Sequence, residues 1–146
     1  MYIDAREYLE EIRTTRIAIN NISRELKSLD YMIEAQGISF NPDVVQSSPR
    51  QDGLERKAIA HIEKCAEYRA NMTEKMEWLH KQLNEAVMYI NKIDSDDQRE
   101  VLMLRYIEHK NWSEILEERN CDDIRSQYKL HERALKSFQM ILNNTI

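Results

Sequence analysis

The chain has 146 residues, of which 32% are charged, and its formal net charge is −5. The length suits one ordinary domain, or a compact domain with a long helical extension. The scarcity of glycine and proline, with abundant Glu, Lys, Arg, Leu and Ile, is typical of a helical protein. The negative net charge excludes a polycation, so any contact with nucleic acid requires a local basic patch.

Other features of the composition restrict the class of protein further. Two cysteines, Cys65 and Cys121, are too few for a disulfide framework. No apolar run approaches the roughly 20 residues that span a bilayer, and the N-terminal segment MYIDAREYLEEIR lacks the apolar core of a signal peptide. We therefore expect a soluble protein of the bacterial cytoplasm.

Two long stretches carry apolar residues at alternating steps of three and four, which is the spacing of a coiled coil. The first series consists of Ala5, Tyr8, Ile12, Thr15, Ile19, Ile22, Leu26, Leu29 and Ile33. The second series consists of Ala58, Ile62, Cys65, Arg69, Met72, Met76, Leu79, Leu83, Ala86, Ile90 and Ile93. Both glycines and both prolines lie between these series and predict one loop at about 36–53. Residues 1–94 are thus predicted to form a long antiparallel coiled-coil helical hairpin.

Capping residues divide the rest of the chain into three shorter helices. Ser95 with Gln98 and Asn111 with Glu114 have the spacing of a capping box. Asn120 suits a left-handed C-cap, and Asp122 or Asp123 can cap the helix that follows. The predicted helices cover residues 96–109, 112–119 and 123–142, within a domain that spans residues 95–146. The overall expectation is an all-α protein.

The last of these helices has a basic face. At 100° per residue its apolar side chains share one side, while Arg125, Lys129, Arg133 and Lys136 fall within an arc of about 80° on the other. A short helix, a tight turn and a cationic stripe on the next helix are what a reader of the DNA major groove requires. The alternative to DNA binding is that the stripe is simply a solvated surface of the helix. The candidate DNA-facing residues are Arg125, Gln127, Lys129, Arg133 and Lys136.

The segments QREVLMLRYIEHKNWSEILEE and LHERALKSF carry a resemblance to a known family. They are similar to DNA-binding region 4 of sigma-70 factors, over about residues 95–142. The whole chain, with its VQSS-containing loop, resembles small phage and prophage proteins near the ArpU/RinA type of late-gene transcriptional regulators. The resemblance implies a three-helix, sigma region 4-like helix-turn-helix domain and a non-enzymatic role in transcription regulation on double-stranded DNA. Trp112, Ile115 and Leu116 would then hold the first helix of the motif.

A protein-interaction module is the alternative function. It would keep the helix-turn-helix shape but bind RNA polymerase or another regulatory protein, and the negative charges of Asp122 and Asp123 favour it. Trp78, Met88 and Tyr89 lie off the helix seam, so we expect them to be buried against the C-terminal helices or in a homodimer.

No metal, cofactor or catalytic site is expected. His61 and Cys65 are four residues apart, which suits a metal, but no second pair accompanies them. Both glycines lie in the predicted loop, so a glycine-rich phosphate loop is not expected either.

Overall fold

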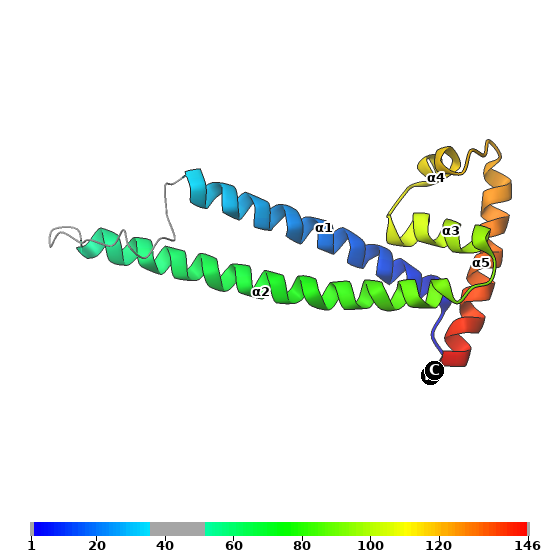
Figure 1. Cartoon of the computed structure of the whole chain (residues 1–146), viewed down its shortest axis with the longest axis horizontal. Helices are drawn as coiled ribbons and strands as arrows, with labels where there is room; N and C mark the ends of the chain where they lie inside the picture. The colour runs from blue at the N-terminus through cyan, green and yellow to red at the C-terminus, as the bar shows by residue number, and fades with distance from the viewer. Residues whose placement is uncertain (1, 36–51, 146) are drawn as a thin grey trace. The chain divides into compact units, whose positions relative to one another are not determined.

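The computed structural model of the chain describes residues 2–35 and 52–145, and these residues form helices joined by short loops (Figure 1). The elements are α1 (Ala5–Ala35), α2 (Asp52–Asn91), α3 (Asp96–Leu102), the π-helical segment η2 (Met103–Ile107), α4 (Trp112–Glu118) and α5 (Ile124–Thr145). No strand occurs within the described ranges, so the prediction of an all-α protein is confirmed for them. None of the described helices combines the length and the apolar character that crossing a membrane requires.

The predicted loop at 36–53 falls almost entirely outside the described residues. Its last two positions, Asp52 and Gly53, belong to the first turn of α2. Most of the predicted seam positions are buried or half-buried, but Ala58 is exposed. Leu9, which was not among the predicted seam positions, is completely buried.

The chain divides into two compact units, and both long helices contribute to each of them. Unit 1 contains Met1–Ile19 and Trp78–Ile146, and unit 2 contains Asn20–Glu77. This division differs from the predicted boundary between residues 94 and 95. The first turns of α1 and the last turns of α2 therefore belong with the short helices and have to be considered together with them.

An aromatic cluster explains why the start of α1 and the end of α2 belong to unit 1. The rings of Tyr8 in α1 and Tyr89 in α2 lie 6.2 Å apart, and their centroids are 5.6 Å and 6.4 Å from that of Phe138 in α5. Gln139, the next residue of α5, accepts a hydrogen bond of 2.8 Å from the Ala5 backbone and donates one of 2.8 Å to the Ile3 carbonyl. The start of α1 is thus held to α5 by apolar and polar contacts together.

The buried residues of the two units differ in number and type. The apolar core of unit 1 consists of Ala5, Leu9, Ile12, Ile19, Leu79, Leu83, Ala86, Ile90, Ile93, Val101, Leu102, Leu104, Tyr106, Ile107, Ile115, Ala134, Leu135, Phe138 and Leu142. In unit 2, only Ile22 and Ile33 are buried to the same degree among the described residues. There the α1 and α2 segments are joined at the surface, where Tyr68 donates a 2.7 Å hydrogen bond to Glu25 and Arg69 pairs with Asp30. Unit 2 therefore has a thin core supported by polar bridges.

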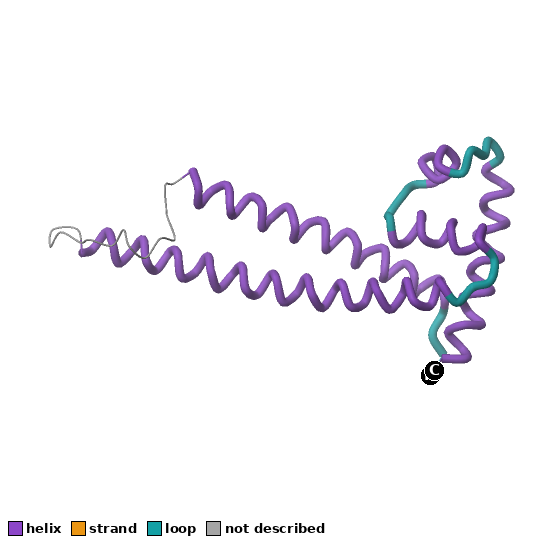
Figure 2. The backbone as a smooth tube through the Cα atoms, viewed as in Figure 1, coloured by secondary structure: helices purple, strands orange, loops and turns teal. Residues whose placement is uncertain are grey.

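The predicted caps of the short helices are largely confirmed. Asn111 and Glu114 form a complete capping box at the start of α4, and Asn120 has a left-handed backbone with φ of 51° just after its end. Ser95 caps α3 through the Gln98 backbone, but the Gln98 side chain accepts a 2.6 Å hydrogen bond from Ser137 in α5 instead of returning to Ser95. Polar side chains thus cap the first turns of α3 and α4. Figure 2 shows loops before and after α4.

The predicted helix 96–109 is not α-helical along its whole length. It widens into η2, where the Glu108 amide bonds to the Met103 carbonyl five residues back, and η2 ends at Ile107. His109, two residues later, has a left-handed backbone with φ of 59°. Widened turns of this kind are uncommon and recur at functional sites. The widening changes the directions of Arg105 and Tyr106 from those that a regular α-helix would give.

Arg119, at the end of α4, connects three helices. Its guanidinium donates to Glu100 (2.6 Å) and Asp97 (3.0 Å) of α3, and its Nε donates to Gln127 of α5 (2.9 Å). The Arg119 side chain is only 11% exposed, so its charge depends on these partners. A guanidinium carries five donors in a fixed planar arrangement that reaches acceptors on several sides, whereas an ammonium group has three donors on a single nitrogen.

We expect Arg119→Met to lower the free energy of unfolding by about 2–3 kcal/mol, because it removes three charge-assisted or polar bonds and leaves Gln127 unpaired. Arg119→Lys should recover part of this loss. Denaturant titration followed by circular dichroism measures the effect. Arg133→Met, on the exposed face of α5, is the matched control and should change the free energy by less than about 0.5 kcal/mol. Equal losses for the two arginines would contradict a joining role for Arg119.

Candidate nucleic-acid interface

Helix α5 presents two distinct faces. Its buried side chains, which include Ala134, Leu135, Phe138 and Leu142, lie on the core side. Arg125, Lys129, Arg133 and Lys136 are all exposed. The structure therefore places four of the five predicted site residues on the solvent side of α5.

Gln127 is the fifth predicted site residue, and it lies elsewhere. Only 6% of its surface is exposed, and its side-chain carbonyl accepts the bond from Arg119. Projection at 100° per residue from Ile124 already places Gln127 among the apolar side chains of α5, opposite the four bases, so its burial agrees with the helix period. Gln127 thus belongs to the joint between α4 and α5, and we leave it out of the candidate surface.

The charges beside the four bases are mostly engaged in other contacts. Glu132, the acid that interrupts them along α5, forms an ion pair of 2.5 Å with Arg6 of α1. The Asp123 carboxylate accepts a 3.0 Å hydrogen bond from the Arg125 amide and so caps α5, as predicted. Asp122 is exposed. The face of α5 thus carries four bases with one acid neutralised beside them.

Aromatic residues hold α4 against α5 and η2. The Trp112 ring meets Tyr128 edge-on at 4.9 Å and His131 at 5.1 Å, and Ile115 is completely buried. Leu116, the third residue predicted to hold this helix, is half-buried. His131 lies inside, where its Nε2 is 2.7 Å from the Tyr106 hydroxyl. Burial and the positive charges of Arg6 and Arg105 lower the pKa of His131 to about 4.

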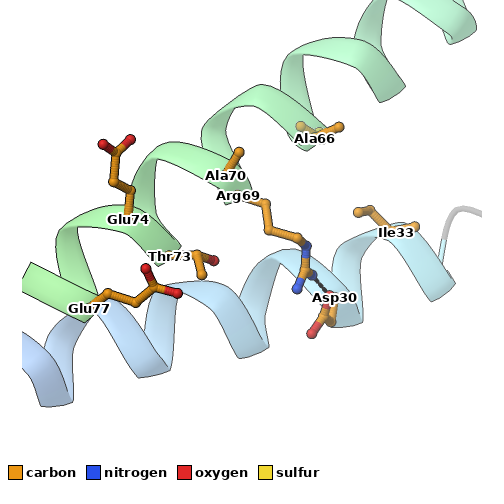
Figure 3. A pocket seen from close by; sticks show the side chains of 9 residues that line it. Asp30, Ile33, Ala66, Arg69, Ala70, Thr73, Glu74 and Glu77 are labelled. Atoms are coloured by element: carbon orange, nitrogen blue, oxygen red, sulfur yellow. Dashed lines mark ion pairs between the residues drawn. The ribbon is translucent and has the colours of Figure 1, made fainter. Parts of the chain in front are cut away.

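The sequence did not predict a cavity and a groove that the structure contains. The first is a cavity of about 200 Å³ in unit 1, whose charged lining includes Arg6, Arg105, Glu10 and Glu132. The second is a groove in unit 2, with Ala66, Ala70 and Ile33 along it and the Arg69–Asp30 ion pair across it (Figure 3). Arg69 in an apolar seam was the one sequence signal of the groove, because an arginine there interrupts side-chain packing.

His61 and Cys65, the pair with the spacing of metal ligands, are not joined by further ligands among the described residues. Cys65 Sγ and His61 Nε2 are 3.8 Å apart on the surface of α2. Within residues 2–35 and 52–145, no group of three or more His, Cys, Asp or Glu side chains could hold a metal ion. The pair therefore has no further ligands among the described residues.

We expect His131 to make stability depend on pH. Its pKa is about 4 in the folded chain and near 6.5 when unfolded, so the unfolded state binds more protons between these values. The resulting stability is present above pH 6.5 and is lost as pH falls toward 4, by about 2 kcal/mol between pH 7 and pH 5. Urea titrations at several pH values measure this loss. It should be absent in His131→Gln and retained in His80→Gln, which alters an exposed histidine. The same pH dependence in both variants would exclude His131 as its source.

The chain was also compared with known proteins. No protein-family model, no curated protein and no solved structure matches it. The resemblance to region 4 of sigma-70 factors consequently rests on the quoted residues alone and stays a hypothesis. The functional assignment depends on the charges and geometry of this chain.

Proposed function

We propose that this protein is a non-enzymatic, DNA-binding regulator of transcription, of phage or prophage origin, that contacts double-stranded DNA through α5. One observation carries the proposal. Arg125, Lys129, Arg133 and Lys136 are exposed along one side of a helix whose other side is fixed in the core of unit 1. Because α5 is already folded, its basic side chains can contact successive DNA phosphates without the backbone having to be ordered first.

A helix-turn-helix made of α4 and α5 is part of the proposal. The left-handed Asn120 lets the chain turn directly after α4, and the Arg119 bond to Gln127 fixes the two helices to each other. Contacts of α4 with both η2 and α5 support the same assignment. We propose an antiparallel coiled-coil hairpin for the preceding long helices, supported by the burial of most positions in the two apolar series.

The local charge of α5 favours an anionic partner although the whole chain is acidic. From Ile124 to the end there are four bases and one acid, Glu132, and that acid is paired with Arg6. At physiological salt, charges further apart than about 8 Å are strongly screened, so the local patch outweighs the net charge of −5.

Binding of a protein partner is the second candidate function, and two observations favour it. The exposed side of α4 is acidic, with Glu114, Glu117 and Glu118 around Lys110. The groove of unit 2 also has small side chains on α2 and carboxylates along its rim (Figure 3). A basic surface of RNA polymerase or of another regulator is the kind of partner that suits such acidic faces.

We expect duplex DNA from the region flanking the gene to be retarded by the protein, with log K falling against log salt at a slope of about −3 to −4 per chain. Lys136→Ala should weaken binding to all sequences alike and reduce the slope by about one. Arg125→Ala, at the start of α5, should instead relax sequence preference at one position by about 1–3 kcal/mol. Fluorescence anisotropy at several salt concentrations gives both quantities.

The matched control is Lys81→Ala, which removes an exposed base from α2 and should leave the slope unchanged. The double change Asp122→Ser with Asp123→Lys lowers the negative charge at the start of α5 and should tighten binding. If the α5 variants and Lys81→Ala all behave like the parent chain, the stripe is a solvated surface. Protein binding is then the better account.

We further expect a homodimer at micromolar concentration. Tyr89 is packed against Phe138, but 59% of Trp78 and 62% of Met88 remain exposed, and large exposed apolar side chains are common at interfaces. Sedimentation equilibrium should give twice the mass of one chain, and Trp78→Ser should shift the equilibrium toward the monomer. Tyr31→Ser, which alters another exposed aromatic residue, serves as the control. A parent protein that remains monomeric would reject the dimer.

A further inference from the structure

His61 and Cys65 form a pair of metal-binding side chains on the surface of unit 2. They are four residues apart on α2, so both lie on one side of the helix. Cys65 Sγ is 3.8 Å from His61 Nε2. In a tetrahedral zinc site, with Zn–S of about 2.3 Å and Zn–N of about 2.0–2.1 Å, the sulfur and nitrogen of two ligands are about 3.5–3.6 Å apart. The two donor atoms are thus already close to the separation that one zinc ion requires.

Both side chains are accessible to an ion from solvent. His61 is exposed, and Cys65 is a half-buried free thiol. Apart from their contact with each other, neither side chain forms a hydrogen bond or an ion pair with another residue in the ranges that the structure describes. Zinc binding would therefore release the thiol proton to water without breaking any other described contact.

One chain supplies too few ligands in this region for a closed zinc site. Structural zinc takes four protein ligands, whereas unit 2 contains no other histidine or cysteine. Asp30 shares the groove of unit 2 with Cys65, but its carboxylate is paired with Arg69 (Figure 3). Two ligands are thus present in the described part of unit 2, and two more are needed.

A second copy of the chain contains the required donors. In a two-fold symmetric dimer the same residues of both copies face each other, so an ion on the axis meets His61 and Cys65 twice. The resulting set of two sulfur and two nitrogen donors is typical of tetrahedral zinc. Symmetry alone therefore completes the site.

Apolar side chains beside the pair favour a second copy over water as the source of the other ligands. Tyr68 follows His61 by seven residues, so it lies on the same side of α2, and it is exposed. Met32 is also exposed, and it lines a hollow of about 530 Å³ together with Tyr68 and Leu29. The core of unit 2 is thin, so a second copy at this surface would cover apolar area that the chain itself leaves open.

We propose that His61 and Cys65 from two copies of this chain bind one zinc ion, which links the copies through unit 2. The inference goes beyond DNA binding and does not depend on it. It also concerns a different surface from that of Trp78 and Met88, which belong to unit 1.

Titration of the whole, reduced chain with cobalt, a spectroscopic substitute for zinc, tests the site. A Trp78→Ser background weakens the dimer expected through unit 1, so a metal-dependent dimer can be measured separately. We expect the absorption of a tetrahedral thiolate–cobalt complex to saturate at one ion per two chains, and zinc to displace the cobalt. In sedimentation equilibrium, zinc should double the mass, and a chelator should restore the mass seen without metal.

Cys65→Ser and His61→Gln should each weaken cobalt binding at least tenfold and abolish the zinc-dependent doubling of mass. Cys121→Ser and His80→Gln are the matched controls, because each removes a thiol or an imidazole outside the pair, and both should bind cobalt like the background chain. Circular dichroism checks that each variant is folded. If Cys65→Ser fails to fold, His61→Gln decides the question, since His61 is exposed.

Three outcomes would overturn the proposal. The first is the absence of any saturable cobalt signal. The second is saturation at one ion per chain without a change in mass, which would exclude an ion shared by two copies. The third is cobalt binding that the folded His61 and Cys65 variants retain in full, which would exclude these residues as the ligands.

Discussion

The guanidinium of Arg119 lies almost out of water and binds side chains of α3 and α5 from the end of α4. A charge in such a place is stable only while all its acceptors stay in position. Because α3 and α5 supply those acceptors and α4 ends at the arginine, the relative positions of the three helices are coupled through one side chain. The seven residues of α4 are too few to form a stable helix alone, so this short element owes its place to Arg119, Ile115 and its capping box.

A second constraint joins the long helices to the short ones. The rings of Tyr8, Tyr89 and Phe138 meet where α1, α2 and α5 come together, and Gln139 holds the start of α1 beside them. The same region of unit 1 contains the cavity of Arg6 and Arg105. The end of a long helix thus serves here as one wall of a polar site. Its sequence has to satisfy packing on one side and charge on the other.

Local signals predicted much of the fold. The caps Asn111, Asn120 and Asp123 were recognisable because capping needs only neighbouring residues. Leu9 was missed because a narrow two-per-heptad seam omits the wider apolar face that a helix presents to several neighbours. The four exposed bases of α5 followed from periodicity alone. Gln127 was wrongly included with them, because the same periodicity places it on the apolar side of α5, where it is buried. The Arg105 cavity needs α1, η2 and α5 together, and no local pattern contains that arrangement.

The bond between Ala5 and Gln139 has a consequence for the order of synthesis, because the two residues are 134 positions apart. At ribosomal rates of about 5–20 residues per second, the start of α1 waits roughly 7–27 s for its partner. During that time the core of unit 1, to which Leu9 and Ile12 belong, lacks the side chains of α5. The exposed Arg6 and Glu10 on the same helix turns keep the nascent segment hydrated. Premature association of unfinished chains is thereby opposed by the same charged residues that later line the cavity.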